Sequence, residues 1–451
     1  MENTETASEI PAQQKPSIYV EIFAGVSTYL TLSYIFIVNP LLLSKAGISI
    51  SSALFATVIS AAAATLLMGL WAKVPFAVAP APSITAFFVS YVVLGMGLSW
   101  PAAMAAVVVS GFLSIAMAQS VRKRLIESIP VPLRVGIIFA VSGFLIANGF
   151  TQAKVISYTA GLLDFAKLTA TAFISPGAIV LYTGLAVTVL FRQKVLKFAG
   201  APLCGIGVAA VVAASFGIKS TSSAEFSWEA MTAQVGQVDF SGLLALDAKF
   251  ILAMFVFFVI DFFGGVGKYV GLFTAMGKKV DDINPVSLDR SLKIDGVGNI
   301  FGGFLGASSL AVFISSAVGI AVGGRSGVTA IVVAILMLLS IFTIPLIGTI
   351  PVEATSGILI FVAFLLIPYK TILGTTYEDK PSERLSPFDI SVCLIAAVIS
   401  FLTYGIDKAI LVVFVTYTGL IVWKGATKKD IILIVVTLLL LIAVIFQFLS
   451  Q

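Results

Sequence analysis

The chain is organised around residues 257–271, with the sequence FFVIDFFGGVGKYVG. This stretch places Asp261 and Lys268 inside an apolar run that is long enough to cross a lipid bilayer. A charge at the centre of a membrane helix costs about 2.5–3.5 kcal/mol, so it usually faces a partner, a cavity or a substrate route. On a helix, both charges would share one face with Gly264 and Gly265. We therefore expect this face to line a functional site; the alternative is a small-residue seam against which another helix packs.

The composition is typical of a polytopic membrane protein. Of its 451 residues, 59% are hydrophobic and only 11% are charged, far from the usual values of soluble domains. The apolar runs have the length of membrane helices and lack the alternating pattern of an outer-membrane barrel. Histidine is absent, and the two cysteines, Cys204 and Cys393, lie in apolar runs, so we expect no metal site, disulfide framework or cofactor. The basic residues form short clusters between apolar runs, which indicates topology and excludes a nucleic-acid patch.

The order of the apolar segments predicts the topology. Residues 1–16 are polar and acidic, which predicts a soluble tail. With a cytoplasmic N-terminus, the basic loops fall on the cytoplasmic side and the acid-leaning loop 218–248 falls on the other, as the positive-inside rule requires. We expect fourteen or fifteen spans, from segments near 18–43, 52–72, 76–97, 101–119, 133–152, 174–191, 197–217, 249–273, 294–306, 308–323, 327–346, 352–370, 386–403, 405–424 and 430–449. Segments 294–306 and 308–323 are short for a spanning helix.

Two of the hydrophobic segments are interrupted by proline, glycine or serine: residues 74–88 and 302–316. We expect each to contain an extended break, near 77–82 and 305–308, that leads into a half-helix. Paired interruptions are typical of transporters built from inverted repeats. Residues 25–32 also resemble residues 265–272. The chain therefore divides into two halves, near 17–217 and 249–449.

Half-helices that start inside the membrane leave backbone N–H groups free, and hydroxyl side chains lie beside the two expected starts. Ser83 and Thr85 accompany the first, and Ser308 and Ser309 the second. Such groups suit a flat, neutral solute with hydrogen-bonding edges or a small anion; the alternative role is helix capping. Five aromatic residues could add a stacking wall: Phe87, Phe88, Phe262, Phe263 and Phe313.

Several motifs resemble the adenine/guanine/hypoxanthine permease branch of the nucleobase–ascorbate transporter superfamily. They are FAGVSTYLTLSYIFIVNP at 23–40, LMGLWA at 67–72, AP at 79–80, IDGVG at 294–298 and GGRSGVTA at 323–330. The resemblance implies an all-α protein of about fourteen spans in two inverted repeats of seven. It further implies a core domain (17–119 and 249–346), a gate domain (120–217 and 347–451) and an extracytoplasmic loop (218–248). The activity that it implies is proton-coupled purine uptake across the cell inner membrane.

The site that this family uses is altered in the present chain. By the resemblance, Thr85 replaces an asparagine, Gly264 a carboxylate, Ser315 a glutamate and Lys268 a small polar residue, while Pro82 interrupts a glycine-rich stretch. Glycine and serine cannot carry a coupled proton, which leaves Asp261 as the acid for proton coupling. Altered selectivity is therefore expected. The substrate-binding residues expected are Ser83, Thr85, Asp261, Gly264, Lys268, Ser308, Ser309 and Ser315.

Two other functions fit the same sequence. Loss of the acids beside Lys268 would also suit an anion transporter or channel of the same architecture. A non-transporting membrane sensor is the third interpretation, whereas no nucleophile–base pair or phosphate loop indicates an enzyme. The partners expected are a nucleobase or small anion, a proton or other coupling ion, the lipid bilayer and a second copy of the chain in a homodimer, with no nucleic acid.

Overall fold

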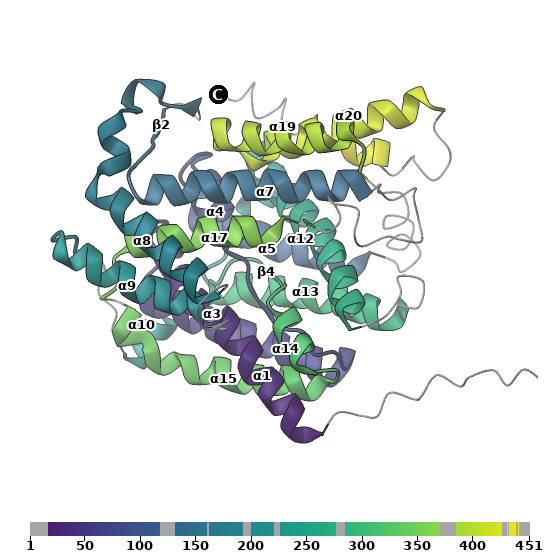
Figure 1. Cartoon of the computed structure of the whole chain (residues 1–451). Coiled ribbons are helices and arrows are strands. Elements are labelled where there is room, and N and C mark those ends of the chain that lie inside the picture. The colour runs from purple at the N-terminus through teal and green to yellow at the C-terminus, as the bar shows by residue number, and fades with distance from the viewer. Residues whose placement is uncertain are drawn as a thin grey trace, which may run out of the picture.

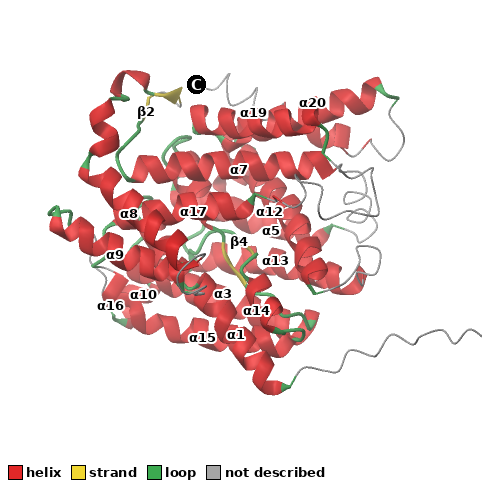
Figure 2. Ribbon diagram, viewed as in Figure 1, coloured by secondary structure: helices red, strands yellow, loops and turns green. Residues whose placement is uncertain are grey.

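The computed structural model is almost entirely helical (Figure 2). It describes residues 17–117, 131–159, 162–192, 200–220, 226–276, 285–347, 349–367, 369, 385–425, 431, 433–438 and 441. Within these residues, four helical stretches are long and apolar enough to span a membrane: Ile18–Ser44, Ile50–Ala72, Val131–Gln152 and Ala248–Phe273. Eight further apolar helices in the described residues are 10–17 residues long. The predicted tail 1–16 lies outside the described residues.

The first half of the chain is mainly helical and, in its described residues, contains three short strands. Serine side chains at Ser17, Ser49, Ser99 and Ser175 accept backbone N–H groups and so fix where four of its helices begin. The elements are α1 (Ile18–Leu32), α2 (Ile35–Ser44), α3 (Ile50–Leu67), the π-helical η1 (Met68–Ala72), β1 (Val78–Pro80), α4 (Pro82–Ala86), the π-helical η2 (Phe87–Val93), α5 (Trp100–Ala116), α7 (Val131–Gln152), β2 (Tyr158–Thr159), β3 (Leu162–Leu163), η3 (Phe165–Lys167), η4 (Ala170–Ile174), α8 (Pro176–Leu190) and α9 (Ala201–Ser215).

The second half follows a connecting loop and contains one short strand among the residues that the structure describes. Its elements are α10 (Trp228–Thr232), α11 (Ser241–Leu244), α12 (Ala248–Ala275), α13 (Pro285–Leu305), β4 (Leu310–Val312), α14 (Ser316–Val322), α15 (Gly327–Leu339), η7 (Ser340–Thr343), α16 (Ile344–Ile347), η8 (Val352–Thr355), α17 (Ser356–Leu366), α19 (Pro387–Thr403) and α20 (Ile406–Trp423). Segment 257–271 lies inside α12, so its predicted helix is confirmed. As in the first half, a short strand precedes a short helix.

The helices pack as two groups, each of which draws on both halves of the chain. In one group α7 packs on α17 and α19, while α8 packs on α9 and α17. In the other, α5 packs on α12 and α13, while α15 packs on α1 and α3. Figure 1 shows α19 and α20 stacked over α7, with α17 beneath α7 and with α1 and α15 at the opposite side of the molecule. This exchange of partners between halves is typical of transporters built from structural repeats.

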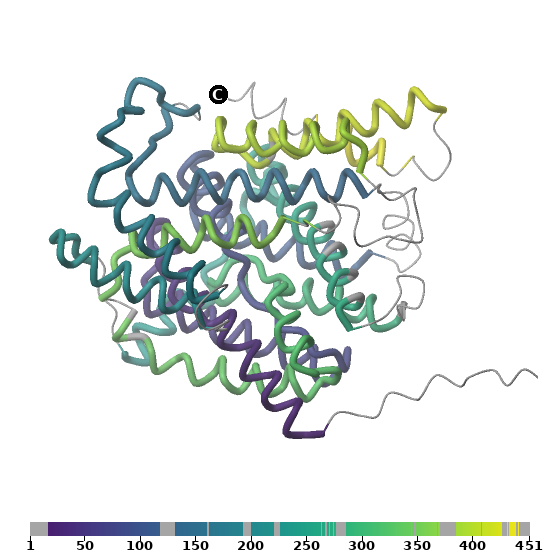
Figure 3. The backbone as a smooth tube through the Cα atoms, in the orientation of Figure 1, coloured from purple at the N-terminus to yellow at the C-terminus, as the bar shows by residue number. Residues whose placement is uncertain are grey.

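The two broken segments meet in the middle of the molecule. Strand β1 pairs antiparallel with β4, and Val78, Ala79 and Pro80 lie opposite Val312, Ala311 and Leu310. The smooth backbone trace in Figure 3 also shows α1 beside α14 and α15, although about 300 residues separate them along the chain. Pairing through backbone hydrogen bonds satisfies polar groups that water cannot reach inside a membrane.

One of the two predicted breaks lies where it was expected, and the other is displaced along the chain. The first break was predicted at 77–82 and coincides with β1. The second was predicted at 305–308, but the strand occupies 310–312 and the following helix begins at Ser316. Gly306 and Ser308 have φ angles of 93° and 71° and turn the chain away from α13 before the strand begins.

The structure shows how the two short apolar runs, 294–306 and 308–323, are folded. Segment 294–306 is the second part of the 21-residue helix α13, and 308–323 forms the separate β4–α14 unit, so these runs are not one element. Most of the last predicted segment, 430–449, lies outside the described residues. Its described residues 431, 433–438 and 441 are helical, and Thr437 hydrogen-bonds Thr418 of α20 over 2.6 Å.

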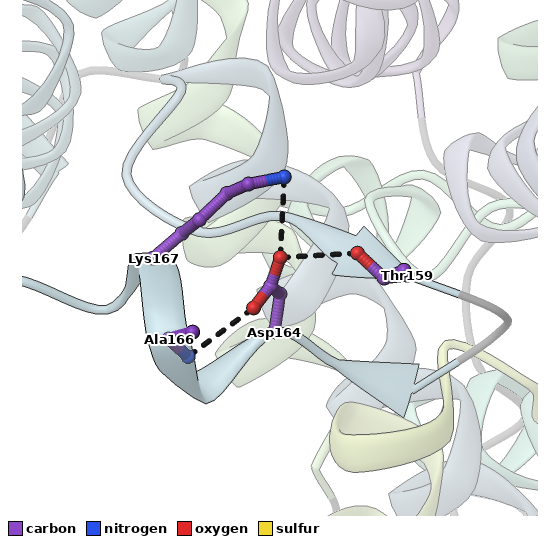
Figure 4. Close-up of polar contacts among 4 residues, drawn as sticks. All are labelled: Thr159, Asp164, Ala166 and Lys167. Atoms are coloured by element: carbon purple, nitrogen blue, oxygen red, sulfur yellow. Dashed lines mark hydrogen bonds and ion pairs between the residues drawn. The ribbon is translucent and has the colours of Figure 1, made fainter.

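The connection between α7 and α8 is stabilised by Asp164 (Figure 4). Its carboxylate contacts the Lys167 ammonium at 3.2 Å and accepts hydrogen bonds from the Thr159 hydroxyl (3.0 Å) and the Ala166 amide (3.2 Å). Hydrogen bonds from Lys167 and Thr159 hold the pKa of this partly exposed carboxyl below its usual value.

Candidate functional site

A cavity lies where both broken segments meet α12 and α17. Its volume is about 30 Å³, which is room for water but well below the 300–1,000 Å³ or so of typical ligand pockets. The walls come from the residue that precedes α2, the two broken segments, α12 and the end of α17. The lining residues are Tyr34, Ala81, Pro82, Ser83, Lys268, Val312, Phe313, Ile314, Ser315, Val362, Leu365 and Leu366.

The polar residues that line the cavity lie on different elements of the fold. Ser83 lies in the first turn of α4, which Pro82 opens. Ser315 precedes α14 and forms no capping hydrogen bond with its side chain. Lys268 lies seven residues after Asp261 on α12, so the helical spacing points both to the same side. The cavity thus combines three hydroxyl groups, those of Tyr34, Ser83 and Ser315, with one ammonium group.

Behind the cavity, Asp261 belongs to a buried hydrogen-bonded cluster. Its Oδ2 accepts a hydrogen bond from Asn299 Nδ2 at 2.9 Å and a short one from the Ser309 hydroxyl. Asn299 Oδ1 in turn accepts the Ser309 hydroxyl at 3.1 Å and the Leu310 amide at 2.7 Å. The other Asp261 oxygen, Oδ1, has no hydrogen-bond partner among the described residues. The cluster ties α12 and α13 to β4.

A second cluster ties the first broken segment to its neighbours. The Thr85 hydroxyl donates to Asn39 Oδ1 at 2.6 Å and lies 2.8 Å from the Ser308 hydroxyl. Asn39 Nδ2 donates to Thr57 at 2.8 Å and to the Ala307 carbonyl at 3.1 Å. Thr85 and Ser308 are fully buried in these contacts. They therefore hold the two breaks together rather than line the cavity.

A second buried carboxylate lies close to Lys268. Asp295 Oδ1 accepts the Tyr269 hydroxyl at 2.8 Å, whereas its Oδ2 has no hydrogen-bond partner among the described residues. A side chain at Gly265 would bring its first carbon to 3.3 Å from this oxygen. Lys268 interacts electrostatically with Asp295 and Asp261. In the part of the chain that the structure describes, no group of acidic or thiol side chains could hold a metal ion.

The residues predicted for the site fall into two groups. Ser83, Lys268 and Ser315 line the cavity, and Gly264 borders open space, since a first side-chain carbon there would meet no atom within 4 Å. The others lie in the two clusters behind the cavity: Thr85, Asp261, Ser308 and Ser309. Ser308 and Ser309 precede β4 and so do not start a half-helix, contrary to expectation.

The predicted aromatic wall is mostly packing. Phe87 stacks on Tyr91 and meets Phe257 edge-on, and Phe88 also packs on Phe257. Phe262 stacks on Phe258, while the side chain of Phe263 is outside the described set. Phe313 is the aromatic residue of the five that lines the cavity.

The sequence reasoning missed several polar residues of the site, namely Tyr34, Asn39, Asn299 and Asp295. A signal for them exists, because each lies within or beside an otherwise apolar run, where a polar side chain needs a partner. Asn39 and Asp295 also fall within the quoted motifs at 23–40 and 294–298.

At the end of the helices away from the cavity, polar contacts join the two helix groups. Asn148 of α7 donates to the Ser90 hydroxyl of η2 at 2.9 Å and to the Tyr404 hydroxyl at 3.0 Å. Within the group that contains α7 and α17, Lys154, just after α7, pairs with Glu353 of η8 at 2.9 Å. Glu353 lies near the start of the segment η8–α17, whose far end, at Leu365 and Leu366, lines the cavity.

Comparisons with known proteins agree with this architecture. The permease family model Xan_ur_permease matches residues 20–372. The adenine permease AdeP of Escherichia coli (strain K12) is 30% identical over 430 residues, which cover 94% of this chain and 92% of the relative. The guanine/hypoxanthine permease PbuO of Bacillus subtilis (strain 168) is 29% identical over 419 residues, covering 90% and 92%.

Among solved structures, the transmembrane domain of the cyanobacterial bicarbonate transporter BicA has a similar fold. Its TM-score is 0.63 at 14% identity, with 87% of this chain and 96% of that one covered. At this identity the likeness concerns the fold alone. Together with the family match, it confirms the predicted all-α core-and-gate fold and the family resemblance. The chain therefore belongs to the Xan_ur_permease family of permeases and is a multi-pass membrane transporter, not an enzyme.

Proposed function

We propose that the protein is a secondary active transporter that takes up a purine or a related nucleobase, with a selectivity changed from that of its relatives. The observation that carries this proposal is the cavity between the two broken segments, α12 and α17. Its hydroxyl groups and Phe313 suit a flat ring with hydrogen-bonding edges. Relatives named as adenine and guanine/hypoxanthine permeases support the same substrate class.

Transport would follow from movement of one helix group against the other. We assign residues 17–119 and 249–346 to the core domain and residues 120–217 and 347–451 to the gate domain. The cavity borders α17 of the gate, and its small volume means that a base enters only when core and gate separate there. With a cytoplasmic N-terminus in the cell inner membrane, the end of the protein that holds the cavity faces the cytoplasm. The contact between Asn148 and Ser90 then closes the opposite, outer end.

Proton coupling would use a buried carboxyl group, with Asp261 as the first candidate. Asp261 and Asp295 each have one oxygen without a hydrogen-bond partner in the described structure, where a proton could reside. Asp261→Asn and Asp295→Asn should separate the two. The variant that lacks the coupling group should lose accumulation against a gradient but keep exchange of labelled for unlabelled base. Asp247→Asn, in the loop before α12, is the control.

Uptake measurements test the substrate class. Labelled adenine, guanine, hypoxanthine, xanthine and uracil are supplied to a host that lacks its own base permeases. We expect accumulation of at least one purine above the vector control. If none of the bases accumulates while the protein is present in the membrane, the proposal is wrong.

A second candidate function is transport of a carboxylate or an inorganic anion by the same architecture. The observation that favours it is Lys268, the one charged residue among the described residues that line the cavity. Purified protein should then bind the anion, and Lys268→Ala should abolish that binding. If binding persists in the variant, this alternative fails.

A further inference from the structure

We propose that Lys268 determines specificity in this cavity by donating hydrogen bonds to a ring carbonyl oxygen, so that the protein prefers oxopurines to adenine. This inference rests on the proposed function of purine transport. It assigns to Lys268 a role in distinguishing between the substrates for which the relatives are named.

The donors and acceptors of the lining residues lead to this preference. Tyr34, Ser83 and Ser315 present hydroxyl groups, which can both donate and accept. Lys268 can only donate, and no carboxylate or amide side chain lines the cavity among the described residues. The substrate edge that faces Lys268 must therefore present acceptors.

Lys268 is available for such a bond. Among the described residues, none forms an ion pair or hydrogen bond with its ammonium group. The two nearby carboxylates each bond other side chains through one oxygen, Asp261 with Asn299 and Ser309 and Asp295 with Tyr269, and neither forms an ion pair with Lys268. An ammonium group without a partner in a membrane interior is costly. A carbonyl oxygen of the substrate would provide that partner.

The surrounding charge favours a neutral carbonyl over an anion. Lys268 interacts electrostatically with Asp295 and Asp261, so its positive charge is opposed by carboxylates behind the cavity. A substrate that carries a full negative charge would be repelled by any of these carboxylates that is ionised. A polar but uncharged oxygen avoids that repulsion and still accepts from the ammonium group.

Adenine lacks this complementarity. Where hypoxanthine and guanine carry a carbonyl oxygen on the six-membered ring, adenine carries an amino group, which is a donor. Placing it against Lys268 would bring two donors together and leave the ammonium group unpaired. Losing one hydrogen bond to a charged group corresponds to about a 10- to 100-fold difference in apparent affinity.

Competition in uptake assays tests the inference. Uptake of labelled hypoxanthine is measured against unlabelled hypoxanthine, guanine, xanthine and adenine in wild type, Lys268→Met, Lys268→Arg and the exposed-site control Lys219→Met. We expect adenine to compete about 10- to 100-fold more weakly than the oxopurines in wild type and in the control. Lys268→Met should bring the two classes close to equality, and Lys268→Arg, which keeps the donors, should retain part of the preference.

The outcomes separate this inference from the function on which it rests. Equal competition by adenine in wild type would overturn it, even if Lys268→Met fails to reach the membrane. A preference that survives in a well-expressed Lys268→Met would overturn it as well. In both cases a purine is still transported, whereas the absence of any purine uptake would instead refute the proposed function.

Discussion

Asn299 should be the most sensitive polar residue of the cluster behind the cavity, because its one side chain serves three partners. It donates to Asp261 and accepts from the Ser309 hydroxyl and the Leu310 amide. In Asn299→Ala, the Leu310 amide and one Asp261 oxygen each lose a partner where water is scarce. An unsatisfied buried group costs about 1–3 kcal/mol, although hydrogen bonds inside membrane proteins average only about 0.6 kcal/mol. Asp261 Oδ2 still accepts the Ser309 hydroxyl in this variant, so the Leu310 amide is the group left unsatisfied, and we expect a loss of about 1–3 kcal/mol.

The assay is thermal unfolding of purified protein in detergent, followed by intrinsic fluorescence, together with base uptake. Gln237→Ala is the matched control, since Gln237 is exposed and its side chain donates to the Ala233 carbonyl, four residues earlier, at 2.8 Å. Asn299→Ala should melt several degrees lower than this control and transport less at equal membrane levels. If the two variants melt together and transport equally, the Asn299 cluster does not hold β4 as we describe.

Three further predictions concern other parts of the fold. A first side-chain carbon at Gly327 would lie 2.0 Å from the Gly69 carbonyl oxygen, so Gly327→Ala should cost about 1–3 kcal/mol through overpacking. Gly207→Ala, on α9 with open space around it, should be neutral or slightly stabilising in the same melting assay, and equal melting of both variants would contradict the close packing. Asn148→Ala removes the hydrogen bond to Ser90 between the helix groups. In a Ser90→Cys background, Asn148→Ala should make the introduced thiol more reactive toward a membrane-impermeant thiol reagent than the control substitution Gln152→Ala does. Equal reactivity of the two variants would argue against a closed outer end. Lys167 and Thr159 lower the pKa of Asp164, so the stabilisation that Asp164 gives to the α7–α8 connection is present above the ordinary carboxyl pKa and is lost as the pH falls through the lowered value. Hydrogen exchange at the Ala166 amide should show this acid sensitivity in wild type. The same acid sensitivity in Asp164→Asn would refute the assignment.

Part of the site was accessible from the sequence because its signals are local. The spacing of Asp261, Gly264 and Lys268 on one helical face follows from the period of the α-helix, and α12 has that period. Pro82 and the glycines near 302–306 predicted breaks, because such residues interrupt a helix wherever it packs. The exact position of the second break was not accessible, since it depends on the register in which β4 meets β1.

The roles of individual hydroxyl groups could not be separated in this way. Ser83 and Thr85 are two residues apart, yet Ser83 lines the cavity and Thr85 bonds Asn39. Likewise, Ser309 reaches Asp261, while the adjacent Ser308 meets Thr85. Neighbouring side chains point in different directions, and their partners lie on other helices.

The amino-acid sequence alone establishes a helical membrane permease with paired breaks and with an acid and a base on one helix. Length, apolar content and short motifs carry that information, because the cost of burying polar groups in a bilayer constrains every segment separately. The three-dimensional structure was needed to show that Asp261 is held by Asn299, 38 residues away, and that Lys268 faces the cavity. Such contacts depend on how helices from both halves pack. Helix packing brings together residues that are far apart along the chain, and no periodic pattern in the sequence marks them as neighbours.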